Sequence, residues 1–60
     1  MKVVNLSRLN KNEIIALTYY AKRLYATDMV IHTDCSIDLF EGNDCICRNY
    51  KPTRQELYKH

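Results

Sequence analysis

One segment near the N-terminus, Asn10 to Tyr25, has apolar residues at helical spacing. Four of them repeat at steps of three, four and three residues: Ile14, Leu17, Ala21 and Leu24. Such a repeat places its members on one face of a helix, here with Tyr20 and Tyr25 at the margins. Asn10 stands three residues before Glu13, the spacing of a capping box. We therefore expect an amphipathic helix that begins after Asn10 and ends near residues 26–28.

Three other apolar residues of this segment lie off that stripe: Ile15, Tyr19 and Ala26. Successive residues of a helix are about 100° apart, so these side chains point to another side. Ile15 and Tyr19 are one turn apart and form a contiguous apolar pair. Exposed apolar groups indicate a contact surface only when they are contiguous. Either a loop or the C-terminal tail covers them, or they form a second face that binds a twin subunit or another protein.

The segments on either side of the helix have the pattern of strands. Lys2 to Leu6 contains paired valines and predicts a short strand. From Met29 to Phe40 apolar and polar residues alternate, which is typical of a strand. Because twelve residues is long for one strand, we expect a break near residues 33–36.

The dipeptide Gly42-Asn43 is a hairpin signal. A two-residue loop pairs Phe40 with Cys45, Leu39 with Ile46, Asp38 with Cys47 and Ile37 with Arg48. This register places Glu41 opposite Asp44, a repulsive pair, so a four-residue loop from Glu41 to Asp44 is an equal alternative. The register with the two-residue loop also places Arg48 on the core face of the sheet.

After Pro52, the residues Thr53 and Glu56 form a second capping box, which predicts a short helix from Arg54 to Lys59. The elements together predict a small α+β fold of order β-α-β-β-α. In it, one main amphipathic helix packs on a short sheet. The first two strands are expected to be parallel and the third antiparallel to the second. Residues 1–60 are expected to form a single domain.

The length limits the function classes. A chain of about 60 residues buries only some 60% of its unfolded surface, so a homodimer is a reasonable expectation and a catalytic cleft is not. We expect no enzyme and no cofactor. The sequence shows neither a secretory signal nor an apolar run long enough to span a membrane. The expected location is therefore the cytoplasm, that of a host cell if the chain is phage-encoded.

The net charge of +2 is distributed unevenly. Residues 1–27 carry five basic side chains and one acidic side chain, a balance of +4. Residues 28–44 carry five acidic side chains and no basic one, and residues 45–60 have a balance of +3. Either these regions neutralise each other in the fold, or an acidic edge is presented to a basic partner. That edge would consist of Asp34, Asp38, Glu41 and Asp44, with Phe40 beside them.

Three cysteines, Cys35, Cys45 and Cys47, cannot close a disulfide framework among themselves. With His32 they supply four ligands of the types that tetrahedral zinc prefers. The alternative is that all three are small apolar thiols. A zinc-stabilised module is therefore one hypothesis for the chain.

The residues VVNLSRLNKNEIIAL and the following AKRL resemble the first half of a ribbon-helix-helix repressor. In that family a short strand precedes an amphipathic helix, pairs with its twin and enters the major groove. The resemblance implies a DNA-binding regulator that uses four basic residues: Arg8, Lys11, Lys22 and Arg23.

The size of the chain and its use of Asn, Lys, Ile and Tyr resemble the short accessory proteins with which bacteriophages redirect or inhibit host proteins. Our first hypothesis is therefore a small non-catalytic interaction protein that binds and modulates, in the simplest case inhibits, another protein. The expected contact surface is either the acidic edge with Phe40 or the pair formed by Ile15 and Tyr19. The DNA-binding regulator and the zinc-stabilised module are the alternatives.

Overall fold

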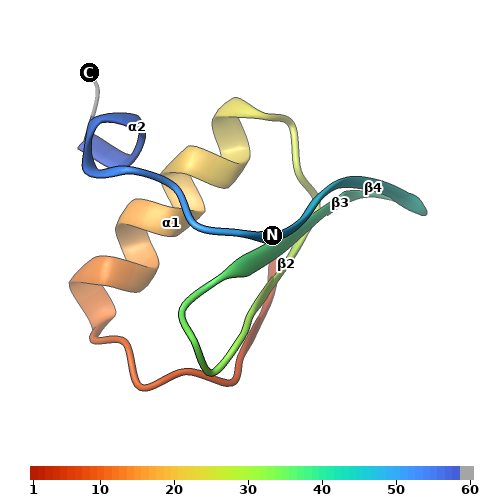
Figure 1. Ribbon diagram of the computed structural model, residues 1–60. Coiled ribbons are helices and arrows are strands. Elements are labelled where there is room, and N and C mark those ends of the chain that lie inside the picture. The colour runs from red at the N-terminus through yellow and green to blue at the C-terminus, as the bar shows by residue number, and fades with distance from the viewer. Residues whose placement is uncertain (59–60) are drawn as a thin grey trace.

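The computed structural model describes residues 1–58, and these form four strands and two helices (Figure 1). Their order is β1 (Lys2–Asn5), α1 (Lys11–Arg23), β2 (Asp28–Ile31), β3 (Ile37–Glu41), β4 (Asp44–Tyr50) and α2 (Arg54–Tyr58). This confirms the predicted α+β fold with one main helix. The predicted second strand, Met29 to Phe40, is divided into β2 and β3, so the predicted order β-α-β-β-α becomes β-α-β-β-β-α. Lys59, the last residue of the predicted terminal helix, lies outside the described residues.

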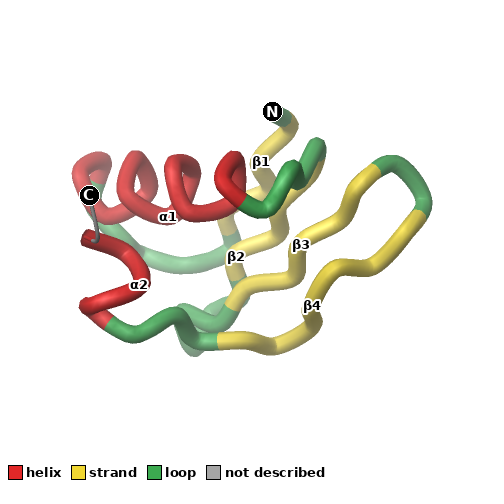
Figure 2. The backbone as a smooth tube through the Cα atoms, turned by 90° about the horizontal axis from the view of Figure 1, so that it is seen from above, coloured by secondary structure: helices red, strands yellow, loops and turns green. Residues whose placement is uncertain are grey.

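The four strands form one sheet in the order β1-β2-β3-β4. β1 and β2 are parallel, since α1 connects them, and β3 and β4 are antiparallel, as the sequence predicted. β2 and β3, which were predicted as one strand with a break, also pair antiparallel. Figures 1 and 2 show both helices on the same side of the sheet, with α2 beside α1. β1 and β4 are thus the two edges of a two-layer structure.

The core lies between α1 and the sheet. Leu17 and Ala21 supply the helix side, and β2 and β3 supply the strand side through fully buried Met29, Ile31, Ile37 and Leu39. These four residues alternate along their strands and share one face, because neighbouring strands pair Met29 with Leu39 and Ile31 with Ile37.

Helix α1 begins where the sequence predicted. The side chain of Asn10 accepts a hydrogen bond from the Glu13 amide at 2.9 Å, which satisfies one of the free N–H groups of the first turn. Glu13 in the first turn and two basic residues in the last turn suit the helix dipole.

The end of α1 differs from the prediction. The helix stops at Arg23, and Tyr25 has a φ of 62°, in the left-handed region. The Ala26 amide donates to the Ala21 carbonyl and the Tyr25 amide to the Lys22 carbonyl, the pair of bonds of a Schellman motif. The reversal turns Tyr25 out to solvent, with 78% of its surface exposed, and brings Ala26 into the core. The predicted places of Tyr25 beside the stripe and Ala26 on the outer face were therefore wrong.

The alternating segment 29–40 breaks as predicted, because β2 ends at Ile31 and β3 begins at Ile37. The His32 amide donates to the Ser36 carbonyl and closes the connection. Inside it, the Asp34 carboxylate accepts from both the amide and the hydroxyl of Ser36, an Asx-type turn. Cys35 adopts a φ of 70° in this turn.

The β3–β4 hairpin has the two-residue loop Gly42-Asn43, and Glu41 pairs with Asp44. Gly42 has a φ of 60° while Asn43 is not among the residues with positive φ, which fits a type II′ turn. The pairing of Phe40 with Cys45 is as predicted, but Leu39 pairs with Cys47 and Ile37 with Tyr50. Two register shifts therefore correct the rest of the predicted register. They also leave Arg48 exposed, not on the core face.

Candidate functional site

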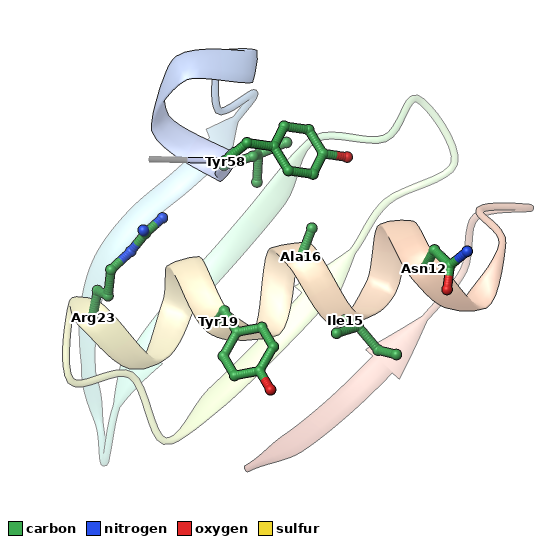
Figure 3. A pocket seen from close by; sticks show the side chains of 7 residues that line it. Asn12, Ile15, Ala16, Tyr19, Arg23 and Tyr58 are labelled. Atoms are coloured by element: carbon green, nitrogen blue, oxygen red, sulfur yellow. The ribbon is translucent and has the colours of Figure 1, made fainter. Parts of the chain in front are cut away.

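A groove of about 620 Å³ lies between the two helices (Figure 3). Its floor and walls are mainly apolar. Five of its residues come from α1 and two from α2: Asn12, Ile15, Ala16, Tyr19, Arg23, Leu57 and Tyr58. This groove unites the predicted pair Ile15 and Tyr19 with Arg23, which the sequence had assigned to a different function.

Ile15 and Tyr19 are exposed because α1 turns its other face to the sheet. Their exposed fractions are 43% and 64%, whereas Leu17 and Ala21 are buried. Figure 3 shows the two side chains leaving α1 in the same direction, and Ala16 on the side that faces Tyr58. The C-terminal segment reaches this region, as one sequence interpretation expected, but it forms a wall of the groove and leaves both side chains open.

The wall formed by α2 is held in place by the Glu56 carboxylate. Tyr50 of β4 donates its hydroxyl to Glu56 at 2.6 and 2.8 Å, and Tyr20 of α1 donates at 3.3 Å. The same carboxylate accepts from the Thr53 amide at 3.0 Å, and the Thr53 hydroxyl accepts from the Glu56 amide. This confirms the second capping box and shows that Glu56 also joins three elements.

The electrostatics of this cluster favour the protonation states that hold it together. Burial, and then the charge of Glu56, raise the pKa of Tyr20 far above its usual value. The hydrogen bond from the Tyr50 hydroxyl to Glu56 raises the pKa of Tyr50. The Thr53 amide and the Tyr50 hydroxyl lower the pKa of Glu56. The carboxylate therefore stays charged and the two hydroxyls stay protonated at neutral pH.

Arg23 belongs to the same cluster. Its guanidinium donates a hydrogen bond to the Glu56 carbonyl and lies over the Tyr20 ring, 5.7 Å from the centroid. The Tyr20 and Tyr50 rings are stacked with centroids 6.5 Å apart. Arg23 thus closes one end of the groove and docks α2 at the same time.

The structure separates the residues of the expected acidic edge. Glu41 and Asp44 face each other beside the hairpin loop and are exposed, and Phe40 next to them is half-buried. Asp34 lies in the β2–β3 connection, beyond the opposite end of β3, and its carboxylate is engaged by Ser36. Among the described residues these carboxylates do not form one continuous edge.

Asp38 differs from the other acidic residues, because only 6% of its surface is exposed. Its carboxylate accepts from the Asn49 amide at 2.7 Å, and His32 Nε2 lies 2.9 Å from its other oxygen. Burial alone would raise the pKa of Asp38, but the Asn49 amide, the His32 side chain and the Arg48 charge together hold it below its usual value. This carboxylate fixes the β4 bulge, where Asn49 has a φ of 52°.

The four residues proposed as zinc ligands are not brought together. Cys35 lies in the β2–β3 connection, whereas Cys45 and Cys47 lie on β4 near the hairpin loop. Cys45 donates its thiol to the Cys47 carbonyl, and burial raises the pKa of the Cys47 thiol. Within residues 1–58 no group of three or more His, Cys, Asp or Glu side chains is placed to hold a metal ion.

The basic residues of the ribbon-helix-helix resemblance lie before α1 and at its two ends. Arg8 precedes α1, Lys11 begins it and Lys22 stands at its end, all exposed, while Arg23 docks α2. β1 pairs in parallel with β2 of its own chain, so in this structure one edge of the strand is occupied by its own sheet.

Sequence reasoning missed the α2 half of the groove. Leu57 and Tyr58 were visible as apolar residues of a short helix, but no local signal gives the position of that helix relative to α1. The sequence signals available for this half of the groove were the tyrosine content and the capping box of Glu56. No helix among residues 1–58 is long and apolar enough to cross a membrane.

Comparisons of this chain with protein-family models, with curated proteins and with solved structures give no significant match.

Proposed function

We propose that this protein is a small non-catalytic interaction protein that binds another protein through the groove between α1 and α2. Binding there would modulate the partner, in the simplest case by occupying a surface that the partner needs for its own contacts. The observation that carries the proposal is the exposure of Ile15 and Tyr19, one turn apart on α1, as walls of that groove.

The composition of the groove supports protein binding. Tyrosine and arginine are enriched at the energetic centres of protein interfaces, and Tyr19, Tyr58 and Arg23 all line this groove. The Glu56 cluster holds α2 in place before any partner arrives. A preformed surface loses less conformational entropy when it binds than a mobile one does.

The proposal is tested by capture from nuclease-treated cell lysate on three forms of the protein. The first is the wild-type chain, the second carries Ile15→Asp and Tyr19→Ser, and the third is the control Tyr25→Ser. Tyr25 is an exposed tyrosine two residues past the end of α1 and is not among the groove residues. Circular dichroism first shows that all three forms are folded.

We expect a protein that the wild-type chain and the Tyr25→Ser control capture and that the groove variant does not. Equal capture by all three forms would mean that the groove is not the binding surface. Recovery of nucleic acid, with loss of the captured protein after nuclease treatment, would instead favour the DNA-binding regulator.

A further inference from the structure

The charges around the groove have one sign. The outward stripe of α1 runs from Lys11 through Ile15 and Tyr19 to Lys22 and Arg23, because residues three and four apart lie on the same side of a helix. Its apolar pair thus has cations one turn before it and one turn after it. On α2, Arg54 is exposed and stands one turn before Tyr58.

The only carboxylates of α1 and α2, Glu13 and Glu56, are directed to other contacts and leave Lys11 and Lys22 as exposed charges of this surface. Among residues 1–58, those that line the groove include no Asp or Glu. Glu13, next to Asn12 in sequence, lines a different cavity with Leu9 and Lys51. The Glu56 carboxylate is directed at Tyr50 and Thr53. A partner therefore meets an apolar surface with positive charge at both ends.

The groove walls are helices, which restricts the shape of the bound segment. The backbone groups within α1 are paired inside the helix, so the groove offers no strand edge with which an extended segment could pair. A segment buried here must satisfy its own backbone groups, and a helix does so internally. A third helix can also place its side-chain ridges between those of α1 and α2.

We propose that the segment bound in this groove is an amphipathic helix of the partner, with apolar residues one turn apart and carboxylates one turn before and after them. This inference rests on the proposed function and names the partner's binding element. The exposed stripe from Lys11 to Arg23 is 13 residues long, so a helix of roughly four turns matches its length of about 20 Å.

The same charges argue against a second copy of this chain in the groove. Two copies packed antiparallel along α1 bring Lys11 of one protomer next to Lys22 of its partner, and parallel packing brings like residues together. Both arrangements place cations against cations without a carboxylate between them, which disfavours association.

The test is a selection from displayed helical peptides on the full-length protein, with the sequence tag at its N-terminus. The peptides carry Leu or Met at one-turn spacing, and each flanking position is Glu, Gln or Lys. The same library is panned on the Ile15→Asp/Tyr19→Ser variant and on the charge variant Lys11→Glu/Lys22→Glu. Arg23 is left unchanged because it docks α2.

Selected peptides with Glu at the flanks, bound by the wild-type chain and about tenfold weaker to the charge variant, are the expected result. The affinity should fall as salt is added, and the charge variant should select Lys at the same positions. Groove-dependent peptides with Gln or Lys flanks would overturn this inference while leaving the proposed function intact.

Peptides that bind the groove variant equally well would overturn both this inference and the proposed function. A failure to enrich any peptide would overturn the inference that the bound segment is a helix. The lysate capture would then test the proposed function separately. Equilibrium sedimentation tests whether a second copy of this chain occupies the groove. A dimer that Ile15→Asp converts to a monomer would identify a second copy as the occupant and contradict the charge argument.

Discussion

Tyr25 ends helix α1 in a conformation that glycine normally supplies. A left-handed φ costs an L-residue roughly 1–2 kcal/mol, and the 78% exposure of Tyr25 means that its side chain returns little of this through packing. What keeps the turn in place is its hydrogen bonding to the last carbonyls of the helix and the burial of Ala26 against the core.

Tyr25→Gly should therefore stabilise the protein by about 0.5–1 kcal/mol, the relief of the left-handed strain less the greater freedom of glycine in the unfolded chain. Urea unfolding followed by circular dichroism measures the change. Tyr25→Ala is the matched control, because alanine removes the same side chain but keeps the strain. An equal gain in both variants would assign the effect to the tyrosine side chain.

Asp38 gives the protein a sensitivity to acid. Its pKa is lowered in the folded state relative to an unfolded value of about 3.9. A lowered folded pKa stabilises the native state at pH values above the unfolded pKa, and this stability is lost as the pH falls through the folded pKa. The free energy of unfolding should therefore decrease between about pH 5 and pH 2.

In Asp38→Asn this decrease should be smaller, since the amide oxygen can still accept from Asn49 but does not titrate. Some slope should remain because Asp34 and Glu56 also have lowered pKa values. Urea unfolding at a series of pH values measures both slopes. Identical slopes would show that Asp38 does not contribute to the acid response.

At the scale of elements, α2 depends on contacts outside itself. A helix of five residues is unstable alone. The Glu56 carboxylate connects it to Tyr20 of α1 and Tyr50 of β4, and Leu57 packs against the core. The wall of the groove is therefore held by this carboxylate, by Leu57 and by the hydrogen bond from Arg23 to the Glu56 carbonyl.

Replacing Glu56 by Ala should loosen α2 while the sheet stays intact. The Leu57 amide, which donates to the Thr53 carbonyl, should exchange its hydrogen roughly tenfold faster or more. The Leu39 amide in the core sheet should exchange only as fast as global unfolding allows. Gln55→Ala on the same helix is the control, and equal acceleration in both variants would contradict the role of the carboxylate.

Elements with local signals were predictable from the sequence, and those without them were not. The start of α1 was evident because Asn10 itself makes the capping bond, and the loop Gly42-Asn43 because glycine marks the turn. The end of α1 was not, since a tyrosine in the left-handed region has no sequence signature. The shifts in β4 were also invisible, because the residue that needs the bulge is Asp38 on another strand.

At the scale of the whole molecule, only the part of the candidate site that has a local sequence pattern could be predicted. Helical periodicity alone separated Ile15 and Tyr19 from the core-facing stripe. It could not place Leu57 and Tyr58 in the same groove, since that depends on contacts between residues more than thirty positions apart, such as Tyr20 with Glu56. Charge counted along the chain suggested an acidic edge, but the fold moved Asp38 inside and put the remaining carboxylates at opposite ends of β3.

The small core makes the molecule sensitive to single truncations inside it. A domain of this length has a stability of roughly 3–9 kcal/mol, while Ile→Ala in a packed core costs about 2–5 kcal/mol. Ile37→Ala should therefore unfold a measurable fraction of the protein at room temperature or lower its thermal midpoint sharply. Leu6→Ala, at a residue that is mostly exposed, should change stability by less than about 0.5 kcal/mol. Comparable losses in both would show that burial in this structure does not determine stability.

The two edges of the sheet are unequal, and this bears on how the protein behaves when concentrated. Along β4 the shifted register interrupts the row of free backbone groups, which makes a poor template for another chain. β1 pairs regularly with β2 and carries exposed Val4. Its protection consists of four-residue length and the charge of Lys2. Precipitation on storage should therefore start at the β1 edge. The substitution Val4→Lys adds a second charge to this edge and should slow precipitation of a purified sample.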